Sequence, residues 1–410
     1  MKFLVLLGDG MADFPIAELN GRTPLEAANT PAMDEVARLG ICALFDPIPE
    51  DLPPGSDVGN LSVFGYDPKT TYTGRAPLEA ARQGIQLGPH DVAFRCNLVT
   101  LQDGVMKSFT AGHISSEEGA ELIAALGAAY VNAPVQFSPG VGYRHLAIVQ
   151  AGEICLDDLS DVVCTPPHNI SDRQFAPHLP DGTAGPFLWT LMEQSHRVLA
   201  DHPVNKARIA AGKPPATSIW LWGQGRSPRM EPFYERFGIR GAVVSAVDLV
   251  NGIGICAGME ALDVPGATGY LDTNYAGKVE AALGALERVD FAYLHVEAPD
   301  ETAHEGRLDL KIQAIEDFDQ KVVAPCLAYA KERGDVRILV APDHITALST
   351  KTHAGGSVPF ALCGPGIVPD AAVAYSETDA RTSGLLFPRG HELVPFMIQS
   401  ARVEVGANPK

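Results

Sequence analysis

The sequence predicts an α/β fold with a mostly parallel central sheet, helices on both of its faces, and an inserted α+β domain. Three apolar runs, at residues 3–7, 291–296 and 336–341, have the length and continuous apolar character of strands buried in a parallel sheet. Each run is followed by carboxylates or imidazoles. Because open α/β sheets place their sites outside the carboxyl ends of their strands, we expect these polar residues to form one site.

The composition is that of a globular protein with two or three domains. The chain has 410 residues, of which 46% are hydrophobic and 20% are charged. Its formal net charge of -19 argues against non-specific binding to nucleic acid or to an anionic membrane surface. A local group of arginines or metal ions can still attract an anionic substrate.

The cysteines and the first residues indicate the compartment. The seven cysteines include no Cys-x-x-Cys pair, and they predict reduced thiols of a cytoplasmic protein. The first apolar run stops at Gly8, which is too early for a signal peptide or a membrane helix.

The first predicted strand, Phe3–Leu7, leads into Gly8-Asp9-Gly10. The two glycines allow a tight turn and leave the Asp9 carboxylate accessible at the end of the strand. An aspartate that only stabilises a turn is the common alternative to a metal ligand. A helix with Pro at its first position and a Thr30 cap is predicted at residues 31–39.

A serine follows two prolines and a glycine at Pro53-Pro54-Gly55-Ser56, where a short helix is predicted to begin. The backbone N–H groups at a helix amino end suit a phosphoryl oxygen, so the Ser56 hydroxyl is a candidate nucleophile. A helix cap is the ordinary role of such a serine. Ser62 falls inside the predicted helix and is a weaker candidate.

The last third of the chain carries the imidazoles that follow the predicted strands. Asp300 and His304 come after the run at 291–296, Asp343 and His344 come after the run at 336–341, and His353 follows. Three histidines and two aspartates exceed what one metal ion usually takes from a protein, so they predict a two-metal site. A histidine buried in a core explains one such residue better than three.

Residues 89–205 predict a separate α+β cap domain, which leaves 1–88 and 206–410 as the core. We expect strands at 91–100 and 145–150, a helix at 115–126 capped by Ser116, and a helix at 187–211 interrupted near Pro203. A strand at 218–222 is assigned to the core, and the helix at 308–333 is expected to break at Pro325.

The motif Gly252–Ala257 fits a dinucleotide-binding G-x-G-x-x-A, but it lacks a clear following helix, so a closely packed turn is favoured.

The motifs stand in the order that is typical of one superfamily. Asp9, Gly-Ser-Asp-Val-Gly-Asn at 55–60, Asp300-x-x-x-His304, Asp343-His344 and His353 resemble the alkaline phosphatase superfamily. More closely, the chain resembles the archaeal-type branch of the cofactor-independent phosphoglycerate mutases. The resemblance covers nearly the whole chain and includes the motifs at 74–80, 221–225 and 265–269.

The resemblance implies two divalent metal ions. Asp9, Ser56, Asp343 and His344 would hold one ion, and Asp300, His304 and His353 would hold the other. Imidazole and carboxylate ligands favour Mn²⁺, with Zn²⁺ as an alternative and Mg²⁺ as a third that usually takes fewer histidines. A metal-activated Ser56 can act as a nucleophile at neutral pH. Asp57 matches a family carboxylate that is thought to handle protons.

A mutase of this kind needs cations that hold the carboxylate and phosphate of a small phosphorylated metabolite. The candidates are Arg95, His113, Arg144, His168, Arg173, Lys213, Arg226 and Arg229. A solvated or locally paired side chain is the alternative for each of them. His168 and Arg173 are preferred because they lie in a Pro-rich loop.

The implied activity is interconversion of 3-phosphoglycerate and 2-phosphoglycerate through phosphoserine at Ser56. Two departures from the family pattern keep other activities open: Asn60 stands where many mutases have His, and His113 stands where archaeal mutases more often have Arg. A bacterial subgroup similar at His113 has been proposed to act as a homoserine kinase, so a phosphotransferase with another acceptor is the first alternative. A metal-dependent phosphatase and a metal-stabilised scaffold are further alternatives, and the sequence leaves the oligomeric state open.

Overall fold

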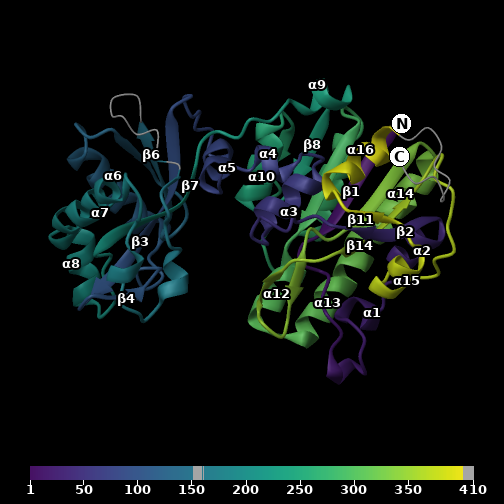
Figure 1. Ribbon diagram of the computed structural model, residues 1–410, viewed down its shortest axis with the longest axis horizontal. Coiled ribbons are helices and arrows are strands. Elements are labelled where there is room, and N and C mark those ends of the chain that lie inside the picture. The colour runs from purple at the N-terminus through teal and green to yellow at the C-terminus, as the bar shows by residue number, and fades with distance from the viewer. Residues whose placement is uncertain (151–158, 160, 400–410) are drawn as a thin grey trace. The chain divides into compact units, whose positions relative to one another are not determined.

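The computed structural model describes residues 1–150, 159 and 161–399, and the chain divides into two compact units (Figure 1). The core unit comprises Met1–Tyr72 and Arg229–Lys410, and the inserted unit comprises Thr73–Pro228. The insertion is therefore longer at both ends than the predicted 89–205.

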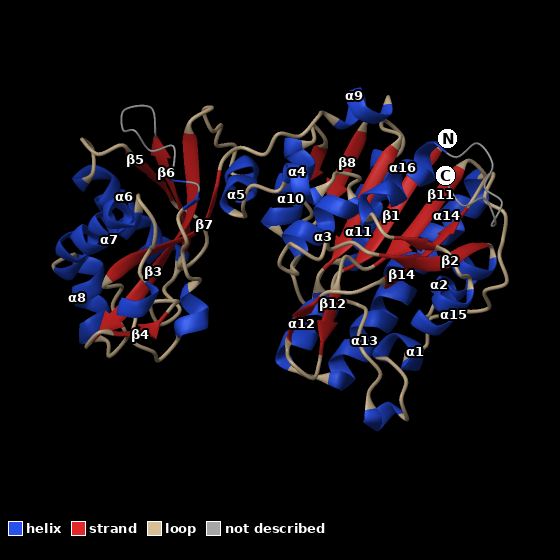
Figure 2. Ribbon diagram, in the orientation of Figure 1, coloured by secondary structure: helices blue, strands red, loops and turns tan. Residues whose placement is uncertain are grey.

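An eight-stranded sheet forms the centre of the core unit (Figure 2). Its strands are β1 (Lys2–Gly8), β2 (Gly40–Phe45), β8 (Gly241–Val244), β9 (Glu260–Leu262), β10 (Phe291–Val296), β11 (Val336–Ala341), β14 (Val358–Cys363) and β15 (Leu386–Phe387). They lie in the order β15-β2-β14-β11-β1-β10-β8-β9. β1 pairs in parallel with both β10 and β11, whereas β14 runs antiparallel to its two neighbours. The predicted α/β class with a mostly parallel sheet is confirmed, and the three predicted apolar strands are its central neighbours.

Helices and short strands complete the core unit. They are η1 (Ala17–Leu19), α1 (Pro24–Ala27), α2 (Pro31–Arg38), α3 (Ser56–Val63), α4 (Pro68–Thr71), α9 (Phe233–Phe237), α10 (Asp248–Cys256), α11 (Tyr275–Ala285), α12 (Ala298–Glu305), α13 (Leu308–Phe318), η6 (Asp319–Val323), α14 (Ala324–Arg333), α15 (Glu377–Thr382), η7 (Gly390–Glu392) and α16 (Leu393–Gln399), with the ribbon of β12 (Ile345–Ala347) and β13 (Thr352–Ala354). Within the described ranges, no helix combines the length and the apolar character needed to cross a bilayer.

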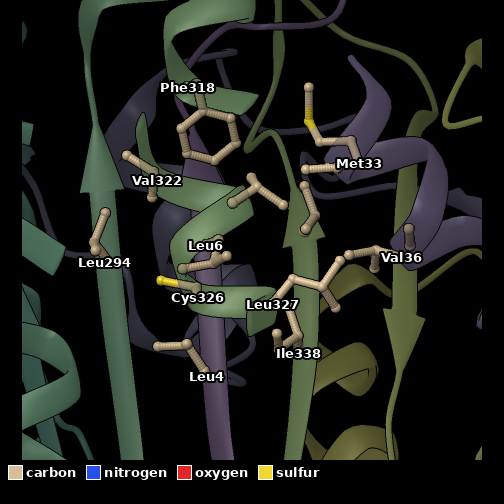
Figure 3. Close-up of a cluster of buried hydrophobic side chains, with 14 of the residues drawn as sticks. Leu4, Leu6, Met33, Val36, Leu294, Phe318, Val322, Cys326, Leu327 and Ile338 are labelled. Carbon is tan, nitrogen blue, oxygen red and sulfur yellow. The ribbon is translucent and has the colours of Figure 1, made fainter. Parts of the chain in front are cut away.

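The core unit buries both faces of its sheet. On one face, Leu4 and Leu6 of β1 pack with Met33 of α2, Phe318 of α13 and Leu327 of α14 (Figure 3). The intervening residues of β1 are buried as well, which explains why the strand is apolar at nearly every position. Each large apolar side chain that is fully buried contributes about 1.5–3 kcal/mol. This packing fixes where the carboxyl ends of the central strands lie.

The glycine motif Gly252–Ala257 lies inside or at the end of α10, so the expected turn is wrong. Gly254 packs directly on β8, and a Cβ at this position would collide with the side chain of Val243. Close contact between the helix and the strand therefore explains why residue 254 is glycine. Because the motif lies in a helix, it does not form the strand-to-helix turn of a dinucleotide-binding site.

The inserted unit is built on an antiparallel five-stranded sheet. Its elements are α5 (Ala76–Arg82), β3 (Asp91–Gln102), β4 (Val105–Ser108), α6 (Ser116–Ala129), β5 (Val135–Ser138), β6 (Arg144–Gln150), η4 (Pro167–Ile170), η5 (Ala176–His178), α7 (Gly185–Ala200), α8 (Pro203–Ala210) and β7 (Ser218–Gly225). β7 pairs with β3, so the assignment of residues 218–222 to the core is wrong. The long strand β3 is buried along almost its whole length and has β6 on one edge and β7 on the other. Because β7 pairs with β3, the chain stays in the inserted unit until the end of β7. The boundary therefore lies at Pro228, later than the predicted 205.

Two expected helix caps are corrected by hydrogen bonds. Ser115, not Ser116, caps α6, with its side chain accepting from the backbone N–H of Glu118. Thr30 makes no side-chain cap to α2; instead, the carboxylate of Asp319 accepts from the backbone N–H groups of residues 32 and 33. Asp319 lies in η6, the π-helical segment that interrupts the predicted helix at 308–333 just before Pro325.

A buried carboxyl at the start of α15 makes the stability of the core unit depend on pH. Burial raises the pKa of Glu377 from 4.5 to about 7, although Thr23 donates a hydrogen bond to it. Because the folded protein holds this proton more tightly than the unfolded chain, the stabilisation is complete below pH 4.5 and is lost as the pH rises through about 7.

We expect Glu377→Gln, which stays neutral, to be more stable than the wild type at pH 8 by up to ~3 kcal/mol, with a smaller difference at pH 5. Urea unfolding of both proteins at the two pH values, with the same metal content, measures this difference. An identical difference at pH 5 and pH 8 would contradict the assignment to Glu377.

Candidate active site

Three predicted ligands meet at the carboxyl ends of β1 and β11. Asp9 follows β1, and Asp343 and His344 follow β11; all three are fully buried. The Nε2 atom of His344 lies 3.2 Å from Oδ1 of Asp9 and 3.4 Å from Oδ2 of Asp343. The parallel pairing of the two strands brings these residues together from positions more than 300 apart in the sequence.

A second group forms beside the first. Asp300 and His304 lie one turn apart on α12, and His353 lies in β13. Nε2 of His304 is 3.1 Å from Oδ2 of Asp300, and Nε2 of His353 is 3.5 Å from its Oδ1. The two imidazole Nε2 atoms are only 3.0 Å apart. His304 is oriented through its other nitrogen, Nδ1, which lies 2.9 Å from the carbonyl oxygen of Lys351.

Ser56 is the first residue of α3, and its Oγ lies 3.2 Å from Nε2 of His344. α3 approaches the turn after β11 closely because residue 59 is glycine; a Cβ there would collide with the carbonyl of Asp343. The other serine candidate, Ser62, is buried and donates its hydroxyl to the carbonyl of Pro47, 2.5 Å away. Of the two serines, only Ser56 lies at the histidine and aspartate cluster.

Asn60 holds this end of α3 in place, a role that sequence reasoning missed. Its side-chain amide donates to the carbonyl of Ser56 at 2.9 Å and to Oδ2 of Asp343 at 2.7 Å. Its carbonyl accepts from the hydroxyl of Tyr293 at 2.7 Å. The residue that departs from the pattern of many mutases therefore ties the serine to an aspartate of the cluster.

Asp57 stands beside the serine but points to different partners. Its Oδ2 accepts from the hydroxyl of Tyr72 at 2.7 Å, and its Oδ1 accepts from the backbone N–H of Val58 at 3.0 Å. These two hydrogen bonds fix the Asp57 carboxylate next to Ser56.

The carboxylates of Asp9, Asp300 and Asp343 are buried close to one another, and this proximity shifts the pKa values of the cluster. Burial and the charge of Asp9 raise the pKa of Asp343 well above its ordinary value. Burial disfavours the charge of Asp9, but the hydrogen bond to His295 and the neighbouring imidazole of His344 outweigh it and hold the pKa of Asp9 below its ordinary value. Burial also disfavours the His344 cation, yet the neighbouring carboxylates raise the pKa of His344 to about 10. The hydrogen bond to Asp300 raises the pKa of His304 to about 9.

Two further residues of the cluster, His295 and Glu297, gave no recognised signal in the sequence. The imidazole of His295 lies between Oγ of Ser245, 3.0 Å from Nδ1, and Oδ2 of Asp9, 2.8 Å from Nε2. Oε2 of Glu297 is 3.4 Å from the same Nε2. His295 lies in β10 and Glu297 lies just after it. Alternate side chains of a strand point to the same face, so the spacing of two residues between them was the available signal.

In the inserted unit, Arg95 and His168 lie against the ring of Trp222, and we call these three residues the Trp222 cluster. The guanidinium of Arg95 lies 4.2 Å from the centre of the indole ring, and the ring of His168 lies 5.3 Å from it. Arg95 also pairs with Glu79 at 3.1 Å. Burial, partly offset by Glu79 and reinforced by Arg75 and Arg144, lowers the pKa of Arg95 to about 10.

The other predicted substrate cations are not brought into this cluster by a described contact. Arg173, Lys213 and His113 are exposed in the inserted unit, and Arg226 is half-buried near its end. Arg229 is exposed and belongs to the core unit. Arg75, which the sequence reasoning passed over, shares the Glu79 carboxylate with Arg95 at 3.3 Å.

A mostly parallel sheet with a serine, carboxylates and imidazoles at the carboxyl ends of its strands defines an α/β protein whose site lies where open α/β sheets place their active sites. The family model for 2,3-bisphosphoglycerate-independent phosphoglycerate mutase matches residues 37–205, and a protein of Geobacter sulfurreducens named as a probable member is 52% identical over 97% of this chain and 100% of its own length. The chain belongs to the 2,3-bisphosphoglycerate-independent phosphoglycerate mutase family.

Further relatives and solved structures agree with this membership. A 2,3-bisphosphoglycerate-independent phosphoglycerate mutase of Methanothrix thermoacetophila is 49% identical over 97% of this chain and 100% of its own. A solved protein of Pyrococcus horikoshii is 31% identical with a TM-score of 0.82, covering 98% of both chains. A cofactor-independent phosphoglycerate mutase of Thermoplasma acidophilum is 26% identical with a TM-score of 0.66, covering 97% of this chain and 99% of that one.

Proposed function

We propose that this protein interconverts 3-phosphoglycerate and 2-phosphoglycerate through a phosphoserine at Ser56, without a bisphosphoglycerate primer. The names of relatives that match over nearly the full length favour this isomerase over a phosphotransferase with another acceptor such as homoserine. The observation that carries the proposal is the position of Ser56 Oγ, 3.2 Å from Nε2 of His344 at the amino end of α3.

We further propose that the cluster holds two divalent metal ions, and its donor atoms support this. Oδ1 of Asp9 and Oε2 of Glu297 are buried without a hydrogen-bond partner among the described residues. Buried carboxylates in this state need a cation. The donor atoms of Asp300, His304 and His353 lie within 4.8 Å of one another, as do those of Asp9, Asp300 and His344.

We assign Asp9, Ser56, Asp343 and His344 to one ion, and Asp300, His304 and His353 to the other. Mn²⁺ suits this mixture of imidazole and carboxylate best, and Zn²⁺ and Mg²⁺ are the alternatives. When bound, the ions would neutralise the carboxylates, lower the pKa of the Ser56 hydroxyl and stabilise charge on the phosphoryl oxygens.

The chain's own residues then divide the reaction between them. The Ser56 oxygen attacks phosphorus while the bond from phosphorus to the glycerate oxygen breaks, and a proton passes to that oxygen. Glycerate then presents its other hydroxyl to the phosphoserine, and the same steps run in reverse. Asp57, fixed by Tyr72, is placed to carry the proton between these steps. The backbone N–H groups at the start of α3 favour the phosphoryl oxygens.

We assign the grip on the carboxylate and phosphate of the substrate to the inserted unit as a substrate-binding cap. Arg95 and His168 of the Trp222 cluster are the strongest candidates, because the buried guanidinium of Arg95, with the Glu79 carboxylate beside it, attracts an anion, and the exposed imidazole of His168 lies against the same indole ring. His113, Arg173, Lys213, Arg226 and Arg229 remain proposed substrate residues. We also propose a cytoplasmic location, which the free thiols of all six described cysteines support.

An enolase-coupled assay tests the proposed reaction. We expect turnover of 3-phosphoglycerate with added Mn²⁺ and no bisphosphoglycerate, and no phosphorylation of homoserine when ATP is supplied. Activity only with ATP and homoserine would replace the mutase by a kinase. Release of inorganic phosphate without 2-phosphoglycerate would indicate a phosphatase.

A further inference from the structure

Thr346 in β12 lies between the two groups of proposed ligands. Its Oγ1 is 2.5 Å from Oδ1 of Asp300 and 3.1 Å from Nδ1 of His344. Asp300 is assigned to one ion and His344 to the other. We propose that the Thr346 hydroxyl is a positioning group that holds one ligand of each metal site in its binding orientation. This inference rests on the two-metal part of the proposed function.

The chemistry of the three groups sets the direction of both hydrogen bonds. An ionised carboxylate only accepts, so the single hydroxyl proton of Thr346 is donated to Asp300. The hydroxyl oxygen then accepts from His344, which places a proton on Nδ1. In the neutral form of His344 that would bind a metal ion, Nε2 is then the nitrogen that carries the lone pair, and it is the atom that lies 3.2 Å from Ser56 Oγ and 3.2 Å from Asp9 Oδ1.

The backbone around Thr346 is held to the turn after β1. The fully buried ammonium of Lys311 donates to the carbonyl of Thr346 at 2.7 Å, to the carbonyl of Ala12 at 3.2 Å and to Asp13 at 2.9 Å. The backbone N–H of Thr346 donates to the carbonyl of Ala12 at 3.3 Å. Gly10 packs against the hydroxyl so closely that a Cβ there would collide with it. The hydroxyl is therefore enclosed and built into the frame that carries Asp9.

A residue that hydrogen-bonds to a metal ligand fixes the orientation of that ligand and so strongly affects the affinity for the metal. Removing a group that orients a metal ligand commonly lowers metal affinity by ~10–100-fold. Because Thr346 contacts a ligand of each group, its loss should weaken both ions, whereas a residue that oriented one ligand would weaken one.

Three variants test this role in the full-length chain. Thr346→Val keeps the shape and removes the hydroxyl, and Thr346→Ser keeps the hydroxyl. Thr302→Val is the matched control, because Thr302 is also fully buried in the core unit, and its hydroxyl bonds to the carbonyls of residues 298 and 299 in its own helix rather than to a proposed ligand. Mn²⁺ binding to the metal-stripped proteins is measured by titration calorimetry.

We expect Thr346→Val to bind both Mn²⁺ ions ~10–100-fold more weakly, Thr346→Ser to retain most of the affinity, and Thr302→Val to bind like the wild type. Wild-type affinity in Thr346→Val would overturn the inference. If the wild type itself bound no Mn²⁺, the proposed metal sites would fail first, so the two failures are distinguishable.

A second measurement needs no Thr346 variant. In ¹⁵N NMR spectra of the wild type loaded with diamagnetic Zn²⁺, the His344 signal, identified by its absence in His344→Gln, should report a proton on Nδ1. A proton on Nε2 instead would overturn the assigned direction of the hydrogen bonds.

Discussion

Ser56→Ala is expected to lose at least ~10⁴-fold in kcat for the conversion of 3-phosphoglycerate, because removal of a nucleophile leaves no covalent route for the phosphoryl group. The loss should fall on kcat, since the cations that hold the substrate are unchanged. The variant should still bind its metal ions, because the aspartates and histidines of the cluster come from other elements. The enolase-coupled assay and metal analysis of the purified variant measure these two quantities.

Ser62→Ala is the matched control for this experiment. Ser62 lies on the same helix, but its hydroxyl is buried against the carbonyl of Pro47. We expect this variant to keep its activity apart from a modest loss of stability. Full activity in Ser56→Ala would remove the nucleophile from the mechanism, and loss of activity only in Ser62→Ala would transfer that role to Ser62.

Removal of divalent metal should abolish activity and lower the melting temperature, and Mn²⁺ should restore both. The physical reason is that Asp9, Asp343 and Asp300 are buried close together, so their carboxylates repel one another when no cation lies among them. Mn²⁺ at about 100 times its dissociation constant stabilises the folded state by ~2.7 kcal/mol per site, which corresponds to a rise of roughly 5–10 °C.

Thermal unfolding after treatment with a chelator, followed by addition of Mn²⁺, Zn²⁺ or Mg²⁺, measures this effect and ranks the metals. In Asp300→Asn the response to Mn²⁺ should be strongly reduced. Asp309→Asn is the control, because Asp309 is an exposed carboxylate paired with Arg307 on the nearby helix α13. Unchanged activity and melting temperature in the chelator would contradict a metal-dependent mechanism.

The sequence was informative where chemistry and strand ends coincide. Apolar runs that end in Asp9, Asp300 and Asp343 predicted both the parallel sheet and the edge at which its polar residues meet. The structure brings these residues together with Ser56 and His344, since neighbouring parallel strands end at the same edge. Their role as metal ligands stays a prediction that the chelation experiment tests.

The residues that support this group could not be found in the same way. Asn60, Thr346 and His295 act through hydrogen bonds to residues far away in the chain, and none of them belongs to a motif whose spacing reveals a partner. The same limit explains the misplaced strand at 218–222. Its apolar pattern predicts a buried strand, but pattern alone does not say whether β3 or the central sheet is its neighbour.

The sequence by itself determined the class of fold, the polar edge of the sheet and the chemical types of the residues there. These follow from local properties, namely the period of the apolar residues and the polar groups at the ends of strands. Only the tertiary structure decided which strand pairs with which, and how the Thr346 hydroxyl and the Asn60 amide orient the cluster. Those outcomes depend on contacts such as Thr346 to Asp300 and Asn60 to Asp343, which are 46 and 283 positions apart, and such contacts leave no local pattern in the chain.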